Sequence, residues 1–497
     1  DTTDNRPIIL IEYLYQICNS GGGMEHFRTL TETYERFQGG YIWDWQDKAL
    51  EAKDDNGNVY FGYGGNFGKS MTEYQHPLFM TNNGIVMPDL TWKPVAYEVK
   101  QIYAPEYILH NKFHDNDLSG FRCVANLREN GMVVASAEQS LENLPPQSQK
   151  KIIVSLPYEY ETEKEYHIDF NIYDSTDYEV SSCQFTLKAG IPSIMTPVFE
   201  LKMPILINEN NASYIITGTD FEYLFSKQTG SIIRFTKGGT DYLINCGNLY
   251  FDRPISGLDA ESGWGYYDEF SLIQRENIEI KITDTQTFLS PDASSAIVDT
   301  AYRFNVRTGE IISGGVRYRI VSDGTVYISF YINSTAYTKH LQRAGIELIL
   351  PEGYDNLQYF AYGETENYCD RKSGVKLGVY ESTIEKQHFA FAPPSENGGH
   401  EEARWLILKN NSGASMKIEG IRPFHFDTHN YTISACGKAK HDHEIIRCKE
   451  TILHIDAAHS PIGSNMAWST VMPKELAVKG GYYSLDFKMV FEKSYEG

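Results

Sequence analysis

A carboxylate closes the first apolar run of the sequence. Glu12 follows Ile8–Ile11 in the stretch IILIEY, whose length and composition predict a parallel strand buried on both faces. A carboxylate is costly to bury unless it is paired or solvated, and in parallel α/β folds the carboxyl ends of the strands carry the active sites. The pattern leaves two interpretations of Glu12 open: a catalytic group, or a cap or salt bridge at the end of the strand.

A second apolar and aromatic run, YIWDWQD (41–47), also ends in polar residues. It places Trp43 and Asp44 at a strand end, and an exposed tryptophan face is a natural platform for the apolar face of a sugar ring. The alternative is that the tryptophans belong to the core and the aspartates are caps.

Three other patterns predict less. In GGNFGKS (64–70) the first glycine of a phosphate loop would fall on Tyr63, so we reject that interpretation. HDHE (441–444) would place two histidines on one face of a strand, but no third ligand is nearby in sequence, and a solvated polar segment is the interpretation we favour. The seven cysteines are scattered and form no CxxC pair, which indicates neither a disulfide framework nor a zinc site.

The composition bounds the class of protein. A chain of 497 residues is too long for one ordinary core, and a net charge of 44 − 66 = −22 disfavours nucleic acid and anionic membranes as partners. No apolar stretch approaches the ~20 residues that cross a membrane. We expect a soluble protein with a neutral small-molecule ligand. No signal peptide is visible and the chain starts with Asp1, so a cytoplasmic and a periplasmic location both stay open.

The elements that must position these residues are of two types. In residues 1 to about 100, two apolar runs flank a helical pattern, which predicts a strand–helix–strand unit. We expect Asn19 or Ser20 to cap the helix and Gly39-Gly40 to end it. The apolar residues of this helical pattern are Met24, Phe27, Leu30, Tyr34 and Phe37.

From about Tyr103 onwards the pattern alternates with a period of two. Examples are YHIDFNIYD (166–174) and GTVYISFYINST (324–335), and turn signals recur between such runs. This predicts two all-β domains, with the proline-containing stretch GIPSIMTPVFELKMP (190–204) as the linker.

The segment that holds Glu12 and Trp43 resembles the large β-galactosidases of the lac type, in glycoside hydrolase family 2. The family pattern there is close to E-Y-x-H-x-M-G-N-S-x-G-G and then Q-G-G-F-[VI]-W-D-W-x-D, and the stretches here are IEYLYQICNSGGG (11–23) and FQGGYIWDWQD (37–47). Further stretches resemble family motifs in the same order, so that the resemblance covers essentially the whole chain: YFGYGGNFG (60–68), AYGETENYCDRKSG (361–374), PPSENGG (393–399) and NMAWS (465–469).

The resemblance implies a multidomain, mainly β architecture. It consists of the C-terminal strands of a TIM (β/α)8 barrel over residues 1–102, an immunoglobulin-like β-sandwich over 103–195, a linker over 196–212 and a large C-terminal β-sandwich of the galactose mutarotase-like type over 213–497. It also implies that the acid/base glutamate and the magnesium ligands of the family lie on earlier barrel strands, upstream of residue 1.

The resemblance assigns roles to five residues. Glu12 matches the nucleophile of a retaining mechanism, which attacks the anomeric carbon of a terminal β-galactoside. Tyr15 stands where the family has a histidine that grips the galactose 6-hydroxyl, and Trp43 matches the tryptophan under the sugar. Asn83 matches an asparagine that helps to hold galactose and a sodium ion. Trp468 matches the tryptophan that the C-terminal domain lends to the aglycone side of the pocket.

Some positions depart from the family pattern. Pro77 and Met80 stand where an aspartate and a phenylalanine usually precede the asparagine that is Asn83 here, which weakens the sodium site. The family's Met-Gly before Asn-Ser is Ile17-Cys18 in this chain.

These resemblances predict a β-galactosidase whose hydrolytic activity needs more than this chain, with magnesium and sodium as the family's metals and the magnesium site outside these residues. The expected partners are a β-galactoside and either further copies of the chain or a complementing N-terminal half. Two alternatives stay open: a non-catalytic assembly or carbohydrate-binding partner, and a family 2 hydrolase with another glycoside specificity.

Overall fold

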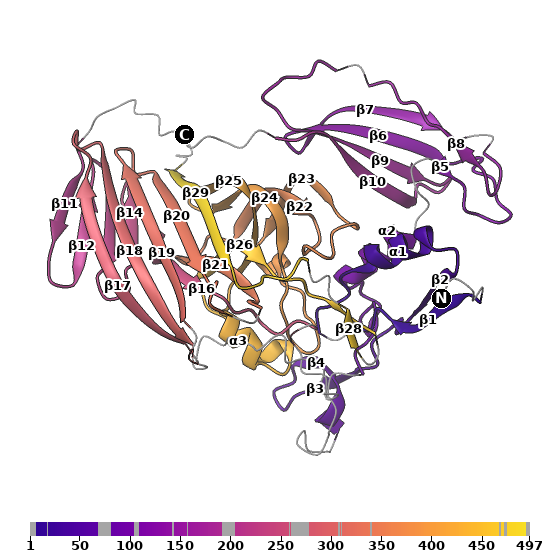
Figure 1. Ribbon diagram of the computed structural model, residues 1–497, viewed down its shortest axis with the longest axis horizontal. Coiled ribbons are helices and arrows are strands. Elements are labelled where there is room, and N and C mark those ends of the chain that lie inside the picture. The colour runs from indigo at the N-terminus through magenta and orange to yellow at the C-terminus, as the bar shows by residue number, and fades with distance from the viewer. Residues whose placement is uncertain are drawn as a thin grey trace.

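The protein consists of three parts that follow one another along the chain (Figure 1). The computed structural model describes residues 6–493 apart from 17, 68–80, 104–108, 142–143, 157, 191–203, 258, 260–277, 307–308, 310, 338–339, 467–468 and 472–474. Within these residues strands far outnumber helices, so the predicted mainly β class is confirmed. In the part of the chain that is described, no helix has both the length and the apolar composition needed to cross a membrane.

The first part holds a parallel strand pair with a helix between the strands, as predicted. Strands β1 and β2 pair in parallel, and β3 and β4 form an antiparallel hairpin. The elements are β1 (Ile8–Tyr13), α1 (Met24–Thr33), β2 (Phe37–Ile42), β3 (Leu50–Lys53), β4 (Val59–Gly62), the 3-10 helix η1 (Gly64–Phe67) and α2 (Pro94–Tyr103).

The predicted ends of the first helix are wrong. Helix α1 starts after Gly23 and ends at Thr33, and the two glycines that were expected to end it lie inside β2. A β-carbon on Gly40 would lie 2.8 Å from both the Cβ and the carbonyl oxygen of Leu10. Gly40 therefore serves the close approach of β2 to β1 and is not a helix stop.

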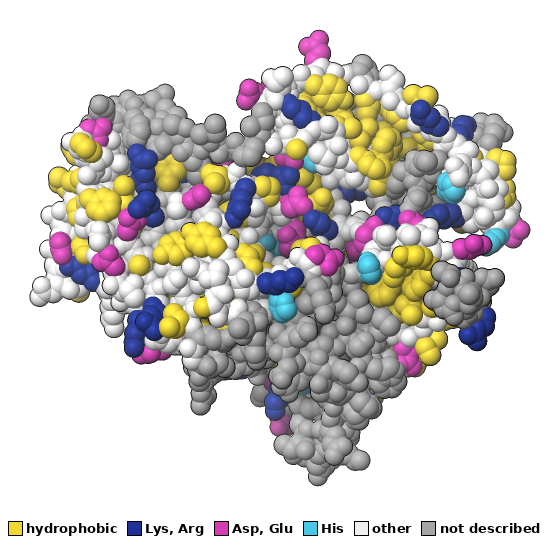
Figure 2. Space-filling model, in the orientation of Figure 1, with side chains coloured by type: hydrophobic (Ala, Val, Ile, Leu, Met, Phe, Trp, Pro, Cys, Tyr) yellow, Lys and Arg dark blue, Asp and Glu magenta, His cyan; other side chains and the backbone are white. Residues whose placement is uncertain are grey.

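The apolar side chains of β1 are not covered on both faces by described residues. Ile9 and Ile11 are 49% and 74% exposed, and Tyr41 on β2 is 69% exposed. Figure 2 shows hydrophobic side chains gathered on this part of the surface, at the right of the view. The buried side of the pair rests on a small core from α1, α2 and the segment before α2, which includes Phe27, Val86 and Val99.

The second part is an antiparallel sheet of four strands in the order β10-β9-β6-β7. It contacts the third part through paired hydrogen bonds: Gln184 donates to the Leu377 carbonyl at 2.8 Å and accepts from the Leu377 amide at 2.9 Å. The predicted strand at 166–174 is β9. The strands are β5 (Leu109–His110), β6 (Arg122–Glu129), β7 (Met132–Ser140), β8 (Gln149–Lys150), β9 (Tyr166–Tyr173) and β10 (Glu179–Lys188).

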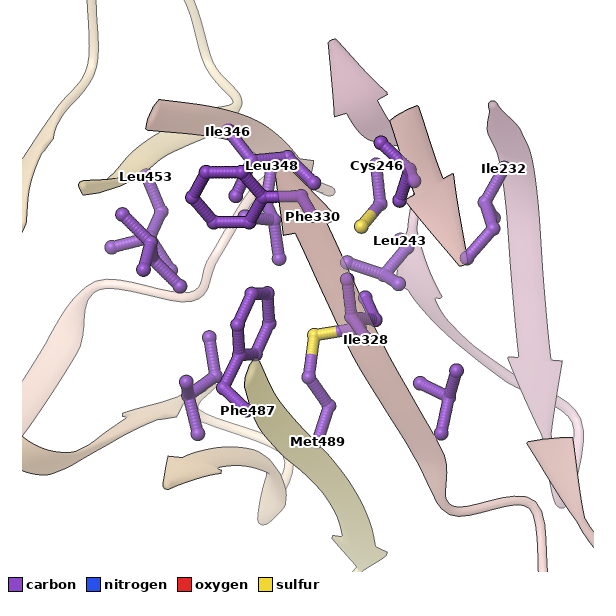
Figure 3. Close-up of a cluster of buried hydrophobic side chains, with 14 of the residues drawn as sticks. Ile232, Leu243, Cys246, Ile328, Phe330, Ile346, Leu348, Leu453, Phe487 and Met489 are labelled. Carbon is purple, nitrogen blue, oxygen red and sulfur yellow. The ribbon is translucent and has the colours of Figure 1, made fainter. Parts of the chain in front are cut away.

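The third part is one hydrogen-bonded sheet of 17 strands, all of them antiparallel to their neighbours where pairs are described. Its first strand, β11, lies within the stretch 196–212 that the sequence predicts as a linker. The predicted strand near residue 330 is β20. Figure 3 shows part of the core, where Ile328 and Phe330 of β20 meet Ile346 of β21 and Phe487 of β29.

The elements of the third part, with a separate short hairpin β27–β28, are β11 (Leu206–Glu209), β12 (Ser213–Thr217), β13 (Phe221–Ser226), β14 (Ile232–Lys237), β15 (Thr240–Leu243), β16 (Asn245–Tyr250), β17 (Ile278–Leu289), β18 (Ser295–Val306), β19 (Ile311–Val321), β20 (Val326–Asn333), β21 (Arg343–Leu350), β22 (Asn356–Gly363), β23 (Lys376–Thr383), η4 (Glu385–Gln387), β24 (His400–Lys409), β25 (Ala414–His429), α3 (Ile433–Lys438), η5 (Asp442–Glu444), β26 (Thr451–His459), β27 (Ser464–Met466), β28 (Ser469–Val471) and β29 (Tyr482–Lys493).

The HDHE segment is not a strand, and it is solvated only in part, since Glu444 is exposed whereas His441 is buried. Residues 442–444 form the 3-10 helix η5, and His441 is buried against the β3–β4 hairpin. The His441 ring lies 4.4 Å from the Tyr60 ring, centre to centre, and its Nε2 is 3.0 Å from the Asn66 amide nitrogen. The segment therefore joins the first part of the chain to the third.

A buried arginine connects three strands of the large sheet. Arg343 on β21 forms ion pairs with Asp427 on β25 and Asp456 on β26, and all three side chains are at most 3% exposed. His425 and His454 bind the same two carboxylates at 2.8 and 2.7 Å. A buried charge of this kind is tolerated because its partners are fixed around it.

We predict that Arg343→Met lowers the free energy of unfolding by about 3–5 kcal/mol, because two buried carboxylates lose the positive charge that they share. Urea unfolding measures the change. The matched control is Arg317→Met, since Arg317 forms a bidentate pair with Asp299 while 60% exposed, and we expect it to change stability by about 0–1 kcal/mol. Equal losses in the two variants would contradict the importance of burial.

A buried glutamate on α2 faces the large sheet. Glu98 is 2% exposed, and its carboxylate accepts a hydrogen bond from the Gly374 amide at 3.0 Å. Burial raises the pKa of Glu98 to about 7, although the Gly374 hydrogen bond and Arg371 oppose the shift. The carboxyl group therefore binds its proton more tightly in the folded protein than in the unfolded chain.

A raised pKa of this kind gives stability that is complete below the unfolded value near 4.5 and is lost as the pH rises through about 7. We predict that Glu98→Gln removes this loss, so that the variant is more stable than the wild type at pH 8 by up to roughly 3 kcal/mol. Thermal unfolding of both proteins from pH 5 to pH 8 tests it. Glu51→Gln, at an exposed position on β3, should follow the wild type at every pH.

Candidate active site

Glu12 occupies a β-bulge at the carboxyl end of β1. Ile11 pairs with Tyr41 and Tyr13 pairs with Ile42, so Glu12 is one extra residue on β1. Bulges next to active sites re-aim a side chain. Glu12 and Leu14 both have φ near 56°, a left-handed conformation that costs a residue other than glycine roughly 1–3 kcal/mol. The strand pairing on both sides of the bulge maintains this strained backbone.

Tyr15 lies close to two carboxylates. It is buried, with 7% of its surface exposed. Burial raises the pKa of the Tyr15 phenol, and the charges of Glu12 and Asp44 raise it further. The phenol is therefore protonated at neutral pH and can donate a hydrogen bond. The structure brings Glu12, Tyr15 and Asp44 within electrostatic reach of one another, which the sequence suggested only through the family motif.

Trp43 and Asp44 follow β2 directly. The Trp43 amide donates to the Tyr13 carbonyl at 3.1 Å, which fixes the end of β2 beside the bulge. The indole is 41% exposed, so it is not a core tryptophan. Lys48 lies 5.1 Å from the centre of the Trp43 ring and forms an ion pair with Asp44. One face of the indole thus carries a cation, and the segment offers an exposed aromatic surface beside two carboxylates.

Asn83 ties the segment after β1 to the segment after β2. Its side-chain amide donates to the Gln16 carbonyl at 2.9 Å, and its own carbonyl accepts from the Asp44 amide at 2.8 Å. The residue is 1% exposed. Its role toward galactose and sodium stays a prediction, because residues 77 and 80, which would complete a sodium site, lie outside the described residues.

The described residues do not offer a set of ligands for the expected metals at this site. Asn83 contributes one amide oxygen. Across the described chain, three acidic or histidine side chains meet at metal-ligand spacing at His425, Asp427 and Asp456, but the Arg343 guanidinium already forms ion pairs with both aspartates. The Arg343 guanidinium therefore supplies the positive charge of that cluster, and the mechanism proposed below involves neither magnesium nor sodium.

A buried ion pair beneath the site supports the Asn83 turn, and no sequence pattern predicted this pair. The Asp47 carboxylate accepts from Lys93 Nζ at 2.7 Å and from the Gly84 amide at 2.8 Å, and both charged side chains are at most 3% exposed. Burial raises the pKa of Asp47 and lowers that of Lys93, although each charge favours the other. Desolvation thus outweighs attraction in this pair. The pair is retained because the loss of either partner alone would leave the other charge buried without a counter-charge.

The loop after β1 is clamped to the third part of the chain. The Asn19 amide donates to the Glu366 carboxylate and to the Glu396 carbonyl, both at 2.7 Å, and Arg371 donates to the Asn19 side-chain oxygen at 2.6 Å. Arg371 also forms a buried ion pair with Glu366. The family-like stretches at 11–23, 361–374 and 393–399 therefore meet in space at Asn19, which gives a physical reason for those motifs.

The C-terminal hairpin reaches the same region. Gly463, just before β27, accepts hydrogen bonds from the Gly21 and Gly22 amides, both at 2.9 Å, and its own amide donates to Asp370 at 2.9 Å. β27 contacts β1, and Figure 1 shows the last strands of the chain, in yellow, passing from the large sheet toward the N-terminal part. Trp468, between β27 and β28 in sequence, lies outside the described residues, so its role stays a prediction.

The topology and these contacts define a β-rich protein with barrel-type strands at its start. Residues 1–108 match the family "Glycosyl hydrolases family 2, TIM barrel domain". Residues 217–489, more than half of the chain, match the family "Beta galactosidase small chain". The chain belongs to the beta galactosidase small chain family. The predicted fold class, including its TIM-barrel strands, is therefore confirmed.

Curated relatives match nearly the whole chain. Beta-galactosidases of Priestia megaterium and Streptococcus thermophilus are each 24% identical, over 93% and 97% of this chain and 45% and 47% of their own lengths. That of Psychromonas ingrahamii is 27% identical over 98% of this chain and 49% of its own length. The chain spans about half the length of the curated relatives that it matches.

Solved structures are similar only at a low level. A galactose 1-epimerase from Lactobacillus acidophilus aligns over 60% of this chain and 100% of its own, with 8% identity and a TM-score of 0.34. A putative aldose 1-epimerase from Escherichia coli aligns over 59% and 100%, with 14% identity and a TM-score of 0.33.

We predict that Lys93→Met lowers the free energy of unfolding by about 3–5 kcal/mol, because it leaves the Asp47 carboxylate buried without a counter-charge. Adding Asp47→Asn should restore most of the loss, since the amide oxygen can still accept from Gly84. Urea unfolding of the single and double variants measures both effects. Lys48→Met is the control, because Lys48 pairs with Asp44 while 52% exposed, and it should cost at most about 1 kcal/mol.

Proposed function

We propose that the whole protein of which this chain is a part is a retaining β-galactosidase, with Glu12 as its nucleophile. The observation that carries the proposal is the strained bulge that holds Glu12 at the carboxyl end of a parallel strand, beside a protonated Tyr15 and an exposed Trp43. Beta-galactosidase is the name of each curated relative described above, which supports the choice of substrate.

In this proposal the Glu12 carboxylate attacks the anomeric carbon of a terminal β-galactoside. The C–O bond to the aglycone breaks, an acid delivers a proton to the leaving oxygen, and a glycosyl ester forms on Glu12. Water then attacks the same carbon, loses a proton to the same acid/base group, and releases Glu12 as a carboxylate. Two inversions give net retention of the anomeric configuration.

The neighbours of Glu12 suit the binding part of this mechanism. Trp43 presents its exposed indole face as a platform for the apolar face of the sugar. Tyr15 donates a hydrogen bond from its phenol to a sugar hydroxyl, because burial and the two carboxylates keep the phenol protonated. Asn83 maintains the spacing between the two strand ends through its bonds to Gln16 and Asp44.

The second carboxyl group of a retaining mechanism lies ~5 Å from the first. Among the described carboxylates, Asp44 lies within electrostatic reach of Tyr15, but it already forms an ion pair with Lys48. We propose that the acid/base group comes from other strands of the barrel. The exposed apolar side chains of Ile9, Ile11 and Tyr41 support this, because further barrel strands would cover them.

We predict that Glu12→Gln in the whole protein lowers kcat on an aryl β-galactoside about 10³-fold or more, because the amide cannot form the glycosyl ester. Steady-state kinetics measure it, with thermal unfolding as a check that the variant is folded. Glu51→Gln, at an exposed glutamate on the β3–β4 hairpin, should keep wild-type kinetics.

The stereochemistry tests the same proposal independently. The β-anomer of galactose should be the first product seen by proton NMR. Glu12→Gln activity close to that of the wild type, or an α-anomer as first product, would refute Glu12 as the nucleophile of a retaining enzyme.

A further inference from the structure

A pocket lies between the start of α2 and the large sheet. Its volume is about 390 Å³, within the 300–1,000 Å³ range of small-molecule sites. Thr91, Trp92 and Tyr97 form one wall, and residues of β22, β23, η4 and the start of β24, with the segments that follow β22 and η4, form the other. Of its lining residues, Glu366 also binds Asn19 in the loop after β1, and Glu12, Tyr15, Trp43 and Asn83 do not line it.

The α2 wall is aromatic and open to solvent. Trp92 and Tyr97 are each 39% exposed, and their ring centres lie 5.3 Å apart with the planes at 63°. Single exposed aromatic residues are ordinary on protein surfaces. Two adjacent rings that line a concave site are the arrangement that binds the apolar face of a sugar, because the rings give contact area without a loss of flexibility on binding.

The opposite wall is polar and offers both donors and acceptors. Glu364 and Lys386 line it from exposed loops, and no described residue forms a hydrogen bond or ion pair with the charged group of either side chain. Glu381 accepts one hydrogen bond, from Gln358 at 3.0 Å, which leaves acceptor capacity on its carboxylate. Sugar hydroxyl groups both donate and accept, so they match such a mixed wall.

Part of this wall is rigid. The Gln387 amide donates to the Ser382 hydroxyl at 2.8 Å and its oxygen lies 2.6 Å from His400 Nε2. His388 lies 2.6 Å from the Asp442 carboxylate through Nε2 and 2.8 Å from the Tyr431 hydroxyl through Nδ1. The wall therefore has a fixed shape before any ligand binds, which lowers the entropy cost of binding.

The charge of the pocket selects the class of ligand. Two carboxylates, Glu364 and Glu381, line it against one lysine, Lys386, while the charge of the third, Glu366, is compensated by its ion pair with Arg371. An anionic ligand such as a sugar phosphate would meet net repulsion, and a neutral polyol would not. We propose that this pocket is a second carbohydrate site, which binds one neutral pyranose ring between the Trp92–Tyr97 pair and the Glu364–Lys386 wall. The proposal does not depend on hydrolysis at Glu12.

The test is calorimetric titration of the complete protein with methyl β-galactoside, methyl β-glucoside and lactose. We expect at least one of them to bind, and Trp92→Ala to weaken that binding about tenfold, because the variant loses the aromatic platform. Trp43→Ala removes the platform at the Glu12 site and should leave this binding unchanged. Tyr482→Ala, which removes a 61% exposed aromatic side chain on β29, is the matched control.

A second pair of variants guards against a folding defect. Glu364→Ala and Lys386→Ala change exposed loop side chains and should each weaken the same sugar without a change in the melting temperature. The absence of binding by all three sugars at millimolar concentration would overturn the proposal. It would also be overturned if Trp43→Ala abolished all binding while Trp92→Ala changed none, or if galactose 6-phosphate bound more tightly than the neutral sugars.

Discussion

The buried guanidinium of Arg371 is the interaction on which the arrangement of the parts depends. It joins Asn19 and Ser20, in the loop directly after Glu12's strand, to Glu366 in the loop after β22. Asn19 in turn binds the Glu396 carbonyl, and the neighbouring glycines bind Gly463. This clamp acts together with the hydrogen bonds from Gly21 and Gly22 to Gly463. The position of the candidate site relative to the large sheet therefore depends in large part on hydrogen bonds to one charged side chain, in a place where water cannot replace them.

Buried ion pairs recur in several places along this chain. Arg343, Arg371 and Lys93 are each nearly inaccessible, and each has a carboxylate partner at hydrogen-bond distance. Such pairs add little to net stability, because desolvation offsets their attraction, but they penalise every arrangement in which the partners fail to meet. The Arg343 and Lys93 pairs join segments far apart in sequence, and Arg371, whose partner Glu366 lies five residues away, also donates to Asn19 in a distant segment. We therefore read them as devices that select one arrangement of the three parts over other compact arrangements with a similar apolar core.

Sequence patterns predicted the elements better than the contacts between them. The parallel pair, the helix between its strands and the alternating strands β9 and β20 follow from local periodicity, which local sterics and burial impose. The end of α1 did not follow, because Gly40 is a glycine for the sake of an approach to Leu10 that no local pattern contains. His441 was read as solvated for the same reason: the surface that buries it, at Tyr60, lies almost four hundred residues earlier. For the candidate site, the family motifs brought attention to Glu12, Tyr15, Trp43 and Asn83, whereas the bulge at Glu12 and the Asp47–Lys93 pair depend on register and burial that only coordinates supply.

The bulge explains why an acid follows an apolar run. In an unbroken strand, side chains alternate between faces, so Glu12 would share a face with Leu10 and would have to enter the same packed surface as its neighbour. The extra residue breaks the alternation and lets Tyr13 reach the core beside Phe27 while Glu12 stays half-exposed near Tyr15 and Asp44. The positive φ angles at Glu12 and Leu14 are the strain that this rearrangement requires. The pairing of Tyr13 with Ile42 and the bond from the Trp43 amide to the Tyr13 carbonyl resist relaxation of that strain. The acid is thus kept out of the core by backbone geometry, and the same geometry aims it at the carboxyl end of the strand, where a ligand can approach.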